Sequence, residues 1–403
     1  MLRTRKSIFL LTLFLALVSA CRPGETLFPA PAEIASAIPR IAALQDTPTP
    51  LPTATPAPTE TPSPTPTPDY PPQGYGPSNF PPEVNPLTGL KAINPALLER
   101  RPVIIKVSNL PRYVRPQWGL TLADIIYEYY TEEGSTRYTA VFYGADAEQV
   151  GDIRSARFFD EHLINMYKGI FAFGSADYRV RYRLYNSNFA NRLILEWNAG
   201  CPAMCRYDPK NFNFLLGNTR ELSAYATKKG IPNGRQNLDG MFFQKVVPAG
   251  GAPAEHIYVR FSAAIYNRWD YDALRGEYLR FSDKENDQSG QGEVYEQLTD
   301  RLTGQSVAAD NVVILFVPHQ YYSRKPEMVE MNFSGSGPAY AFRDGQVYPV
   351  TWQRPAAESV VYLTYEDGRP FPFKPGATFF EVVGKSSTVE QTELGWRFLF
   401  LIP

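Results

Sequence analysis

The densest group of residues that can do chemistry lies between residues 115 and 157 of the 403-residue chain. Residues 154–157 fall at the predicted start of a helix, where free backbone N–H groups and the helix dipole favour an anion. Arginine side chains add planar donors that fit phosphate and carboxylate oxygens. The pattern therefore predicts a polar site for phosphate, a carboxylate or a pyrophosphate-linked wall precursor. Its candidate residues are Arg115, Glu128, Glu132, Arg137, Arg154, Ser155 and Arg157.

The same residues also suit a purely structural role. Arg154 or Arg157 can pair with Glu128 or Asp160 and so hold a sheet against the helix. Buried arginine–carboxylate pairs of this kind are common in folded proteins. The sequence favours this internal pairing slightly over an open site.

Motifs for other chemistries are missing from the sequence. There is no Gly-rich phosphate loop ending in Lys-Ser/Thr and no Gly-x-Ser-x-Gly elbow. The three histidines, His162, His256 and His319, lie far apart and show no metal-ligand spacing. We therefore expect no metal site and no cofactor, name no catalytic residue, and consider an enzyme the less favoured class.

Cys201 and Cys205 are the other chemically notable pair. In an oxidising compartment two thiols four residues apart across a proline turn usually form a disulfide. So short a ring removes little chain entropy, so its stabilising effect is expected to be small. Free or redox-active thiols are the alternative.

Strands and helices must position these groups. Alternating apolar and aromatic segments predict strands, and a 3.6-residue apolar period predicts helices capped by Ser155 and Asn218. The strands are expected at residues 102–108, 124–130, 136–143 and 169–174, and the helices at 155–167 and 219–229. Residues 178–185 alternate strictly, as a strand does, but also suit a helix.

The second half of the chain has mostly β composition. Asp344-Gly345 and Asp367-Gly368 suit tight hairpin turns, because glycine adopts positive φ without steric cost. Residues 282–297 are expected to form a long exposed loop, and Gly250-Gly251 a domain boundary. Strands are expected at residues 258–261, 312–317, 339–342, 346–350, 360–365 and 378–383.

The N-terminus has the features of a secretory signal. Three positive residues precede an apolar run at residues 8–17, which is too short to span a bilayer, and then Val18-Ser19-Ala20-Cys21. These four residues resemble a bacterial lipobox, in which the cysteine becomes lipidated; an ordinary signal peptide with a chance cysteine is the alternative. We expect residues 1–20 to be a signal peptide and Cys21 to anchor an extracytoplasmic protein to the membrane.

The composition supports a folded body behind a tether. Residues 21–84 are rich in Thr and Pro and are expected to be a disordered tether. The whole chain is 44% hydrophobic, which is ample for a core, and its formal net charge is -1. Such a balance offers no general basic field, so nucleic acid is excluded as an expected partner.

Many short motifs in order carry a family likeness. NPLTGL at 85–90, RPQWGL at 115–120, ADIIYE at 123–128, IRSAR at 153–157 and ADNVVILFVPH at 309–319 closely resemble the YerB-like family of bacterial lipoproteins. The likeness covers essentially the whole folded part. It implies surface anchoring and an α+β fold: a layered β/α sandwich at residues 85–250, then a mostly antiparallel β domain at 251–403. The order of segments in the family also favours a helix at 178–185.

The resemblance carries over no reaction, because both domains are of unknown function. A link to cell-wall synthesis is suspected for such proteins. Where the family tends to have Pro-His-Asn and Asn-Asn-His-Pro, this sequence has Pro209-Lys210-Asn211 and Ser108-Asn109-Leu110-Pro111, without either histidine. This departure weakens any general acid–base proposal.

Together these observations predict a non-catalytic envelope lipoprotein that binds wall polymer or a wall-synthesis protein. The alternatives are an enzyme on anionic wall precursors, such as a phosphotransferase or hydrolase, and a solute receptor for small anions, which needs a deep cleft.

Overall fold

The computed structural model describes residues 70–208, 210, 214–290, 292–393 and 395–402. The chain divides into two units, residues 1–65 and residues 66–403, and the description below concerns the second. The predicted signal peptide, Cys21 and the tether up to residue 69 lie outside the described residues. Within the described part, no helix is both long enough and apolar enough to cross a membrane.

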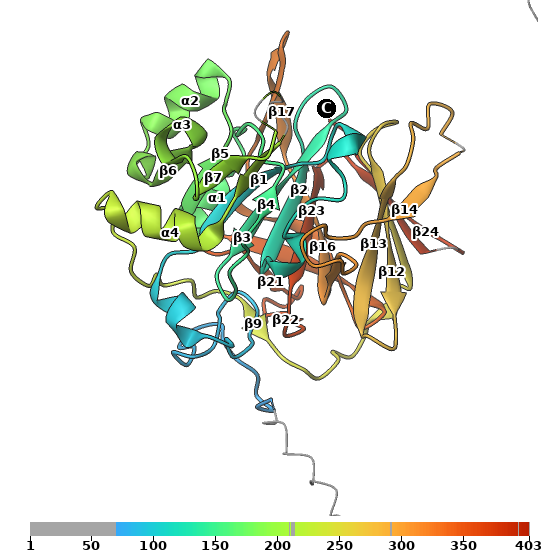
Figure 1. The fold of residues 1–403 in the computed structure, drawn as a ribbon. Coiled ribbons are helices and arrows are strands. Elements are labelled where there is room, and N and C mark those ends of the chain that lie inside the picture. Colours follow the sequence, from blue (N-terminus) through green and yellow to red (C-terminus); the bar gives the residue numbers. More distant parts are fainter. Residues whose placement is uncertain (1–69, 209, 211–213, 291, 394, 403) are drawn as a thin grey trace, which may run out of the picture. The chain divides into compact units, whose positions relative to one another are not determined.

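A mixed sheet, with eleven strands among the described residues, forms the centre of this unit (Figure 1). Its five central strands are buried along their whole length, as continuous Val, Ile, Phe and Tyr runs require. They are β1 (Val103–Ser108), β2 (Ile125–Tyr130), β3 (Thr136–Phe142), β16 (Asn311–Val317) and β23 (Thr378–Gly384). β23 lies between β16 and β2 and runs parallel to both. Strands from both sides of the predicted boundary near residue 250 thus share one sheet, and the division into two domains stays a prediction.

The edges of this sheet come from opposite halves of the chain. At one end lie β19 (Gly335–Arg343), β20 (Gln346–Arg354) and β10 (Ala252–Pro253), with β21 (Tyr362–Thr364) paired to β20. At the other end lie β5 (Ile170–Phe173) and β6 (Leu193–Leu195). The predicted Asp344-Gly345 turn joins β19 to β20, with both residues at positive φ.

A second sheet has seven strands among the described residues and comes wholly from the second half of the chain. Its strands β12 and β13 form a long hairpin that carries Trp269 and Arg280. The seven are β11 (His256–Arg260), β12 (Tyr266–Asp272), β13 (Glu277–Asp283), β14 (Tyr295–Gln297), β15 (Ala308–Ala309), β24 (Thr388–Thr392) and β25 (Gly395–Leu399).

Three small sheets complete the β structure. The hairpin of β17 (His319–Arg324) and β18 (Glu327–Met331) stands at the top of the view in Figure 1. The other two are β9 (Phe242–Phe243) with β22 (Pro372–Phe373), and β8 (Leu215–Gly217) between β4 (Val150–Gly151) and β7 (Met204–Arg206).

The helices gather at the β5–β6 end of the central sheet (Figure 1). They are α1 (Asp160–Tyr167), α2 (Tyr178–Tyr185), α3 (Glu196–Ala199) and α4 (Thr219–Lys228). Short 3-10 helices span Pro95–Glu99, Arg112–Val114, Leu120–Leu122 and Ala190–Arg192. Asn218 caps α4 by accepting from the N–H of Glu221, as predicted. The structure is therefore α+β with a large excess of strand, in agreement with the coarse prediction.

The ambiguous segment 178–185 is the helix α2. Val180 and Leu184 face the core, and the carboxylate of Asp177 caps the helix through the N–H of Arg179 at 2.9 Å. A strand would have put Tyr178, Val180, Tyr182 and Leu184 together on one face, whereas the helix buries Val180 and Leu184 and leaves Tyr178 and Tyr182 exposed.

The predicted start of α1 is wrong. The helix begins at Asp160, and Ser155 is not its N-cap. The N–H of Arg154 donates to Lys106 O and the N–H of Ala156 donates to Ser175 O, so neighbouring backbone holds this segment extended. Arg154 and Ser155 therefore precede the helix, and the predicted anion site is not formed by the helix N-terminus.

Two segments that were predicted to be irregular contain residues with defined contacts in the structure. Residues 70–84, assigned to the tether, contact the body: Tyr75 pairs with Phe243, and Val84 is fully buried. The long loop expected at 282–297 begins as the end of β13 and ends as β14, and Asp283 within it is buried. Cys201 and Cys205 form a disulfide with Cα atoms 4.8 Å apart.

Candidate functional site

The predicted polar residues meet around an open groove of about 510 Å³. It lies between the loop before the Arg112–Val114 turn, the β2–β3 hairpin and the segment that precedes α1. We name it the arginine groove, because Arg112, Arg137 and Arg154 line it. The other lining residues are Leu110, Pro111, Glu132, Glu133, Ser135, Thr136, Ala264 and Asn286.

Glu132 is the carboxylate that the arginines share. Its Oε1 accepts from Arg137 Nη2 at 2.9 Å and also pairs with Arg157 Nη2, while its Oε2 accepts from Arg157 Nε at 2.6 Å. Although burial opposes ionisation, the bonds from Arg157 and the charge of Arg137 lower the pKa of Glu132 to about 2. Glu132 is thus a fixed anion and a poor general base.

Three guanidinium groups lie near this one carboxylate. Burial together with neighbouring Arg157 lowers the pKa of Arg137 to about 9, and the same two causes lower the pKa of Arg154. A guanidinium stays protonated at neutral pH, so these shifts reflect the cost of burying the charge and the repulsion between neighbouring arginines. An anionic ligand in the groove would reduce this repulsion.

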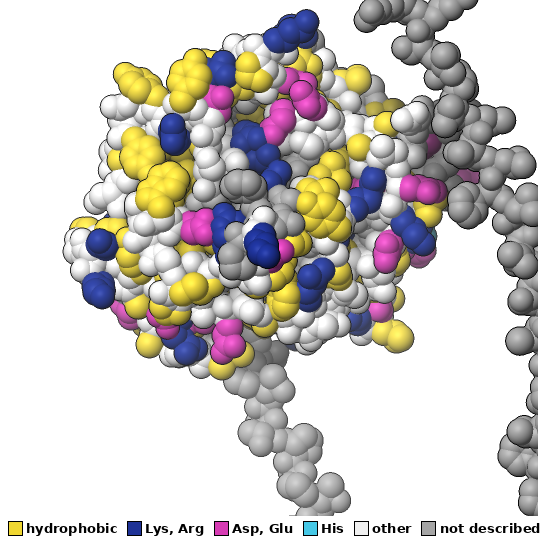
Figure 2. Space-filling model, turned by 45° about the horizontal axis from the view of Figure 1, so that its top comes forward, with side chains coloured by type: hydrophobic (Ala, Val, Ile, Leu, Met, Phe, Trp, Pro, Cys, Tyr) yellow, Lys and Arg dark blue, Asp and Glu magenta, His cyan; other side chains and the backbone are white. Residues whose placement is uncertain are grey.

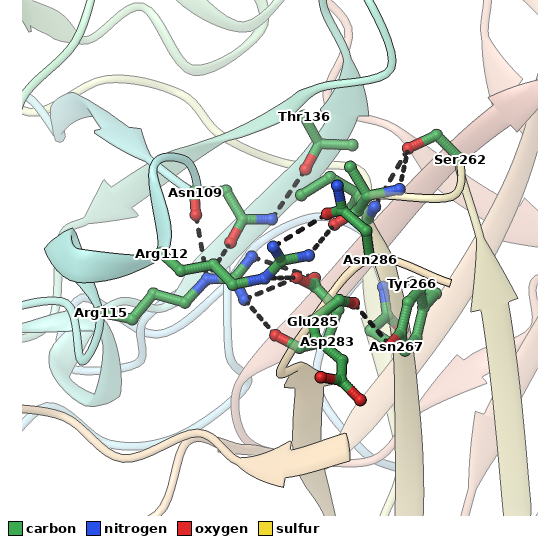
Figure 3. A network of polar contacts seen from close by, with 12 residues as sticks. Asn109, Arg112, Arg115, Thr136, Ser262, Tyr266, Asn267, Asp283, Glu285 and Asn286 are labelled. Carbon is green, nitrogen blue, oxygen red and sulfur yellow. Dashed lines mark hydrogen bonds and ion pairs between the residues drawn. The ribbon is translucent and has the colours of Figure 1, made fainter. Parts of the chain in front are cut away.

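One wall of the groove is tied to the second sheet by Asp283, as Figure 3 shows. Arg112 Nε donates to its Oδ2 at 2.6 Å, and Arg115 bonds both carboxylate oxygens at 3.1 Å. The Arg115 side chain is 9% exposed and that of Asp283 1% exposed. Arg115 also donates from Nε to the side chain of Asn109 at 3.0 Å. Arg115 is therefore a structural residue that holds the groove wall to the second sheet.

Beneath the groove lies a fully buried triad of ionisable groups. Glu128 on β2 and Glu381 on β23 stand opposite each other in the parallel register, and Arg280 from β13 pairs with both. Trp269 Nε1 donates to Glu381 at 3.0 Å, and Asn109 Nδ2 donates to Glu128 at 2.9 Å. Glu128 is thus an internal ion-pair partner that joins the central sheet to the second sheet.

A second interior cluster surrounds Lys106 on β1. Its ammonium contacts Tyr129, Thr139 at 3.2 Å and Asp160 at 3.3 Å, all from buried side chains. Burial lowers the pKa of Lys106 to about 7, with Asp160 opposing and Arg137 adding to the shift. These groups have no exposed surface, so they position α1 on the sheet and do not meet solvent.

The structure thus separates the predicted site into two parts. Arg137 and Arg154 line the open groove with Glu132, while Arg157 and the Ser155 carbonyl support it from behind. Arg115 and Glu128 belong to the interior. Internal pairing occurs, but the partner of Arg157 is Glu132 and not the expected Glu128, and Asp160 receives the Arg157 backbone N–H at 2.7 Å.

Sequence reasoning missed several charged residues of this region. A single charge inside an apolar strand was the available signal for Lys106 (PVIIKVS) and Glu381 (FFEVVG). Arg112, Arg280 and Asp283 gave no such signal, because arginine and aspartate among other polar residues are usually solvated.

Metal binding finds no support in this region. Within the described residues, no group of three or more His, Cys, Asp or Glu side chains can hold a metal ion. His162 is 3.0 Å from Met331 O and 3.2 Å from Arg354, and burial with the Arg354 charge lowers its pKa to about 4. Burial also lowers the pKa of His319 to about 4, so both rings are neutral at physiological pH.

Comparisons with known proteins agree with this fold. Residues 87–232 match the N-terminal domain, and residues 257–380 the C-terminal domain, of a family described as "Protein of unknown function (DUF3048)". The "Putative lipoprotein YerB" of Bacillus subtilis (strain 168) is 28% identical over 317 residues, covering 74% of this chain and 85% of the relative. The crystal structure of YerB protein from Bacillus subtilis matches with a TM-score of 0.62 and 24% identity over 74% of this chain and 96% of that chain, and so supports the fold alone.

Proposed function

This chain belongs to the DUF3048 family of proteins of unknown function, and from that premise we propose that it is a non-catalytic binding module of the cell envelope. In this proposal the lipid on Cys21 holds the protein outside the membrane, and the arginine groove binds an anionic group of a wall polymer or wall precursor. The name of the Bacillus subtilis relative as a lipoprotein supports the anchoring part.

The observation that carries the binding proposal is the gathering of three arginines around one ionised carboxylate at an open groove. Arg137 and Arg157 pair with Glu132, and Arg137 and Arg154 line the groove. Guanidinium groups in fixed positions give strong, directional bonds to phosphate and carboxylate oxygens. A phosphate-bearing polymer fits this arrangement.

The same groove supports binding over catalysis. Glu132 is held ionised by two arginines, and the two carboxylates of the buried triad lie beneath the surface. A general base must reach the proton that it abstracts and must have a pKa near the working pH. The pKa of Glu132 lies far below the working pH, and Glu128 and Glu381 are too deeply buried to reach a ligand, so each of the three carboxylates fails one of these conditions.

We expect Arg154→Gln to weaken binding of a soluble glycerol phosphate polymer at least tenfold. Loss of one charge-assisted hydrogen bond costs about 1.5–3 kcal/mol, which corresponds to roughly tenfold or more in affinity. Calorimetric titration at low and high salt checks this, since screening should weaken binding by the wild-type protein. Arg369→Gln is the matched control, because Arg369 is an exposed arginine that pairs only with neighbouring Asp367 among the described residues.

Equal binding by wild type and Arg154→Gln, or no binding by either, would overturn the proposed role of the groove. Turnover of the polymer, or of inorganic pyrophosphate, by the wild-type protein would overturn the non-catalytic part. A melting temperature close to wild type confirms that the Arg154→Gln variant is folded.

We expect Cys21→Ala to release the full-length protein from the membrane fraction. Acyl chains add about 0.8 kcal/mol of membrane affinity per buried CH₂, so their loss removes the anchor. Fractionation of cells that express each form, followed by immunoblotting, measures the change. Persistent membrane association of Cys21→Ala would argue against lipidation, and Cys201→Ala is the control for loss of a cysteine elsewhere.

A further inference from the structure

A second open groove, of about 640 Å³, lies between α2 and the β17–β18 hairpin. Its volume falls within the range of about 300–1,000 Å³ that is usual for ligand sites. Aromatic rings from both elements line it: Tyr178 and Tyr182 of α2, Tyr322 of β17, and Phe158 from the segment before α1. We name it the tyrosine groove.

The tyrosine rings of this groove are unusually exposed. Tyr178, Tyr182 and Tyr322 are 67%, 74% and 47% exposed. Tyr178 and Tyr182 are four residues apart and therefore lie on one face of α2. The face shown in Figure 2, which turns the top of Figure 1 forward, exposes several separate groups of hydrophobic side chains with Lys and Arg side chains between them. Aromatic side chains exposed around a concave surface mark an interaction site.

The walls of the tyrosine groove are held in place before any ligand binds. The rings of Phe158 and Tyr322 pack with centroids 4.8 Å apart, and the Arg183 guanidinium lies 4.2 Å from the Phe158 ring. Arg183 also pairs with Glu330 of β18 and lies 4.0 Å from Glu161 of α1. These contacts tie the helix to the hairpin and hold the rings of Phe158 and Tyr322, so binding against this wall costs little ordering.

The charges of this groove are balanced, unlike those of the arginine groove. Arg179 pairs with Asp177 at 2.9 Å, and Arg183 has two carboxylate neighbours. The groove therefore offers flat apolar faces with charged and amide groups at the edge, and no large excess of one sign. A phosphate group would find less compensation here than in the arginine groove, so the favoured ligand is uncharged or nearly so.

We propose that the tyrosine groove binds the sugar rings of a glycan strand. A pyranose ring presents an apolar face of C–H groups and a rim of hydroxyls, which complements exposed tyrosine faces bordered by Arg179, Asn186 and Glu161. The site goes beyond the proposed function, because it is separate from the arginine groove and takes a different chemical group. The segment 154–161 borders both grooves, with Arg154 in the first and Glu161 in the second.

The test is titration of the full chain with the tetrasaccharide of N-acetylglucosamine, followed by NMR or calorimetry. We expect saturable binding by the wild-type protein and at least a tenfold loss in Tyr178→Ala combined with Tyr182→Ala. The double variant with phenylalanine at both positions should keep most of the affinity, because ring stacking is retained. Tyr185→Ala is the matched control, since Tyr185 is 43% exposed on the same helix but does not line the groove.

Arg154→Gln should bind the tetrasaccharide normally, so failure of the phosphate site and failure of the sugar site give different results. Absence of saturable binding by the wild-type protein, or equal binding by the alanine double variant, would overturn the proposal. If the wild-type protein bound phospholipid vesicles but no sugar, and the alanine double variant lost the vesicle binding, the groove would be a membrane contact. That result would also overturn the proposal. Unchanged melting temperatures exclude unfolding as the cause of any loss.

Discussion

Replacing Arg280 with leucine is expected to lower the free energy of unfolding by about 3–5 kcal/mol. Its side chain is 1% exposed and forms the ion pairs with both Glu128 and Glu381, whose side chains are fully buried. Without the guanidinium, two carboxylates stand opposite each other on adjacent strands with no buried cation between them. Removing one partner of a buried ion pair costs far more stability than replacing all of its members by uncharged residues.

Chemical denaturation of the wild-type and variant proteins measures this loss. A triple variant, Arg280→Leu with Glu128→Gln and Glu381→Gln, should recover part of the lost stability, because it removes both carboxyl groups together with the guanidinium that they pair with. Arg268→Leu is the matched control on the neighbouring strand, where the arginine is 27% exposed and pairs with Asp270, and it should cost about 1 kcal/mol or less. Wild-type stability of Arg280→Leu would show that the triad does not join the two sheets.

The second large effect that we expect is a dependence of folding stability on pH, caused by the titration of Glu381. Burial, together with the adjacent Glu128, raises the pKa of Glu381 to about 8, although Arg280 opposes the shift. The unfolded chain releases this proton near the ordinary pKa of about 4.3, whereas the folded protein keeps it up to pH 8. The stability that this proton contributes is therefore fully present below the unfolded-state pKa of about 4.3 and is lost as pH rises through the folded-state pKa of about 8.

Glu381→Gln should flatten this part of the pH profile. One group that behaves in this way changes stability by at most about 1.4 kcal/mol per pH unit within its window. Unfolding midpoints in denaturant at pH 5, 6, 7 and 8 measure the slope for wild type and variant. Glu390→Gln, an exposed change on β24, should leave the slope unaltered. Equal slopes for wild type and Glu381→Gln would mean that Glu381 is ionised in the folded protein.

Local patterns were sufficient to predict most of the elements around the site. Strands β1, β2, β3 and β5 lie where apolar and aromatic runs indicated them, and Asn218 caps α4 as expected. These features depend on residues within a few positions of one another. The helix at 178–185 needed the resemblance to a family as well, because its alternation alone favoured a strand.

The start of α1 and the loop at 282–297 show where local patterns fail. Residues 154–156 have helix-compatible side chains, but bonds to Lys106 and Ser175 hold their backbone extended. Asp283 lies in a polar stretch that suggests an exposed loop, yet Arg112 and Arg115 bind it in the interior. In both cases the deciding partner comes from another part of the chain.

The sequence, together with the family resemblance, predicted the α+β class and most strands and helices, and it contains the secretory and lipobox patterns and the concentration of arginine and glutamate near residues 128–157. Only the tertiary structure decided which of those charges are buried and which line a groove. Glu128 pairs with Arg280, which is 152 positions away in the chain. Glu381 lies opposite Glu128 because β23, from the last part of the chain, pairs with β2. The cost of burying a charge depends on the partner that packing brings to it, and that partner is set by the pairing of distant strands, which no short stretch of sequence encodes.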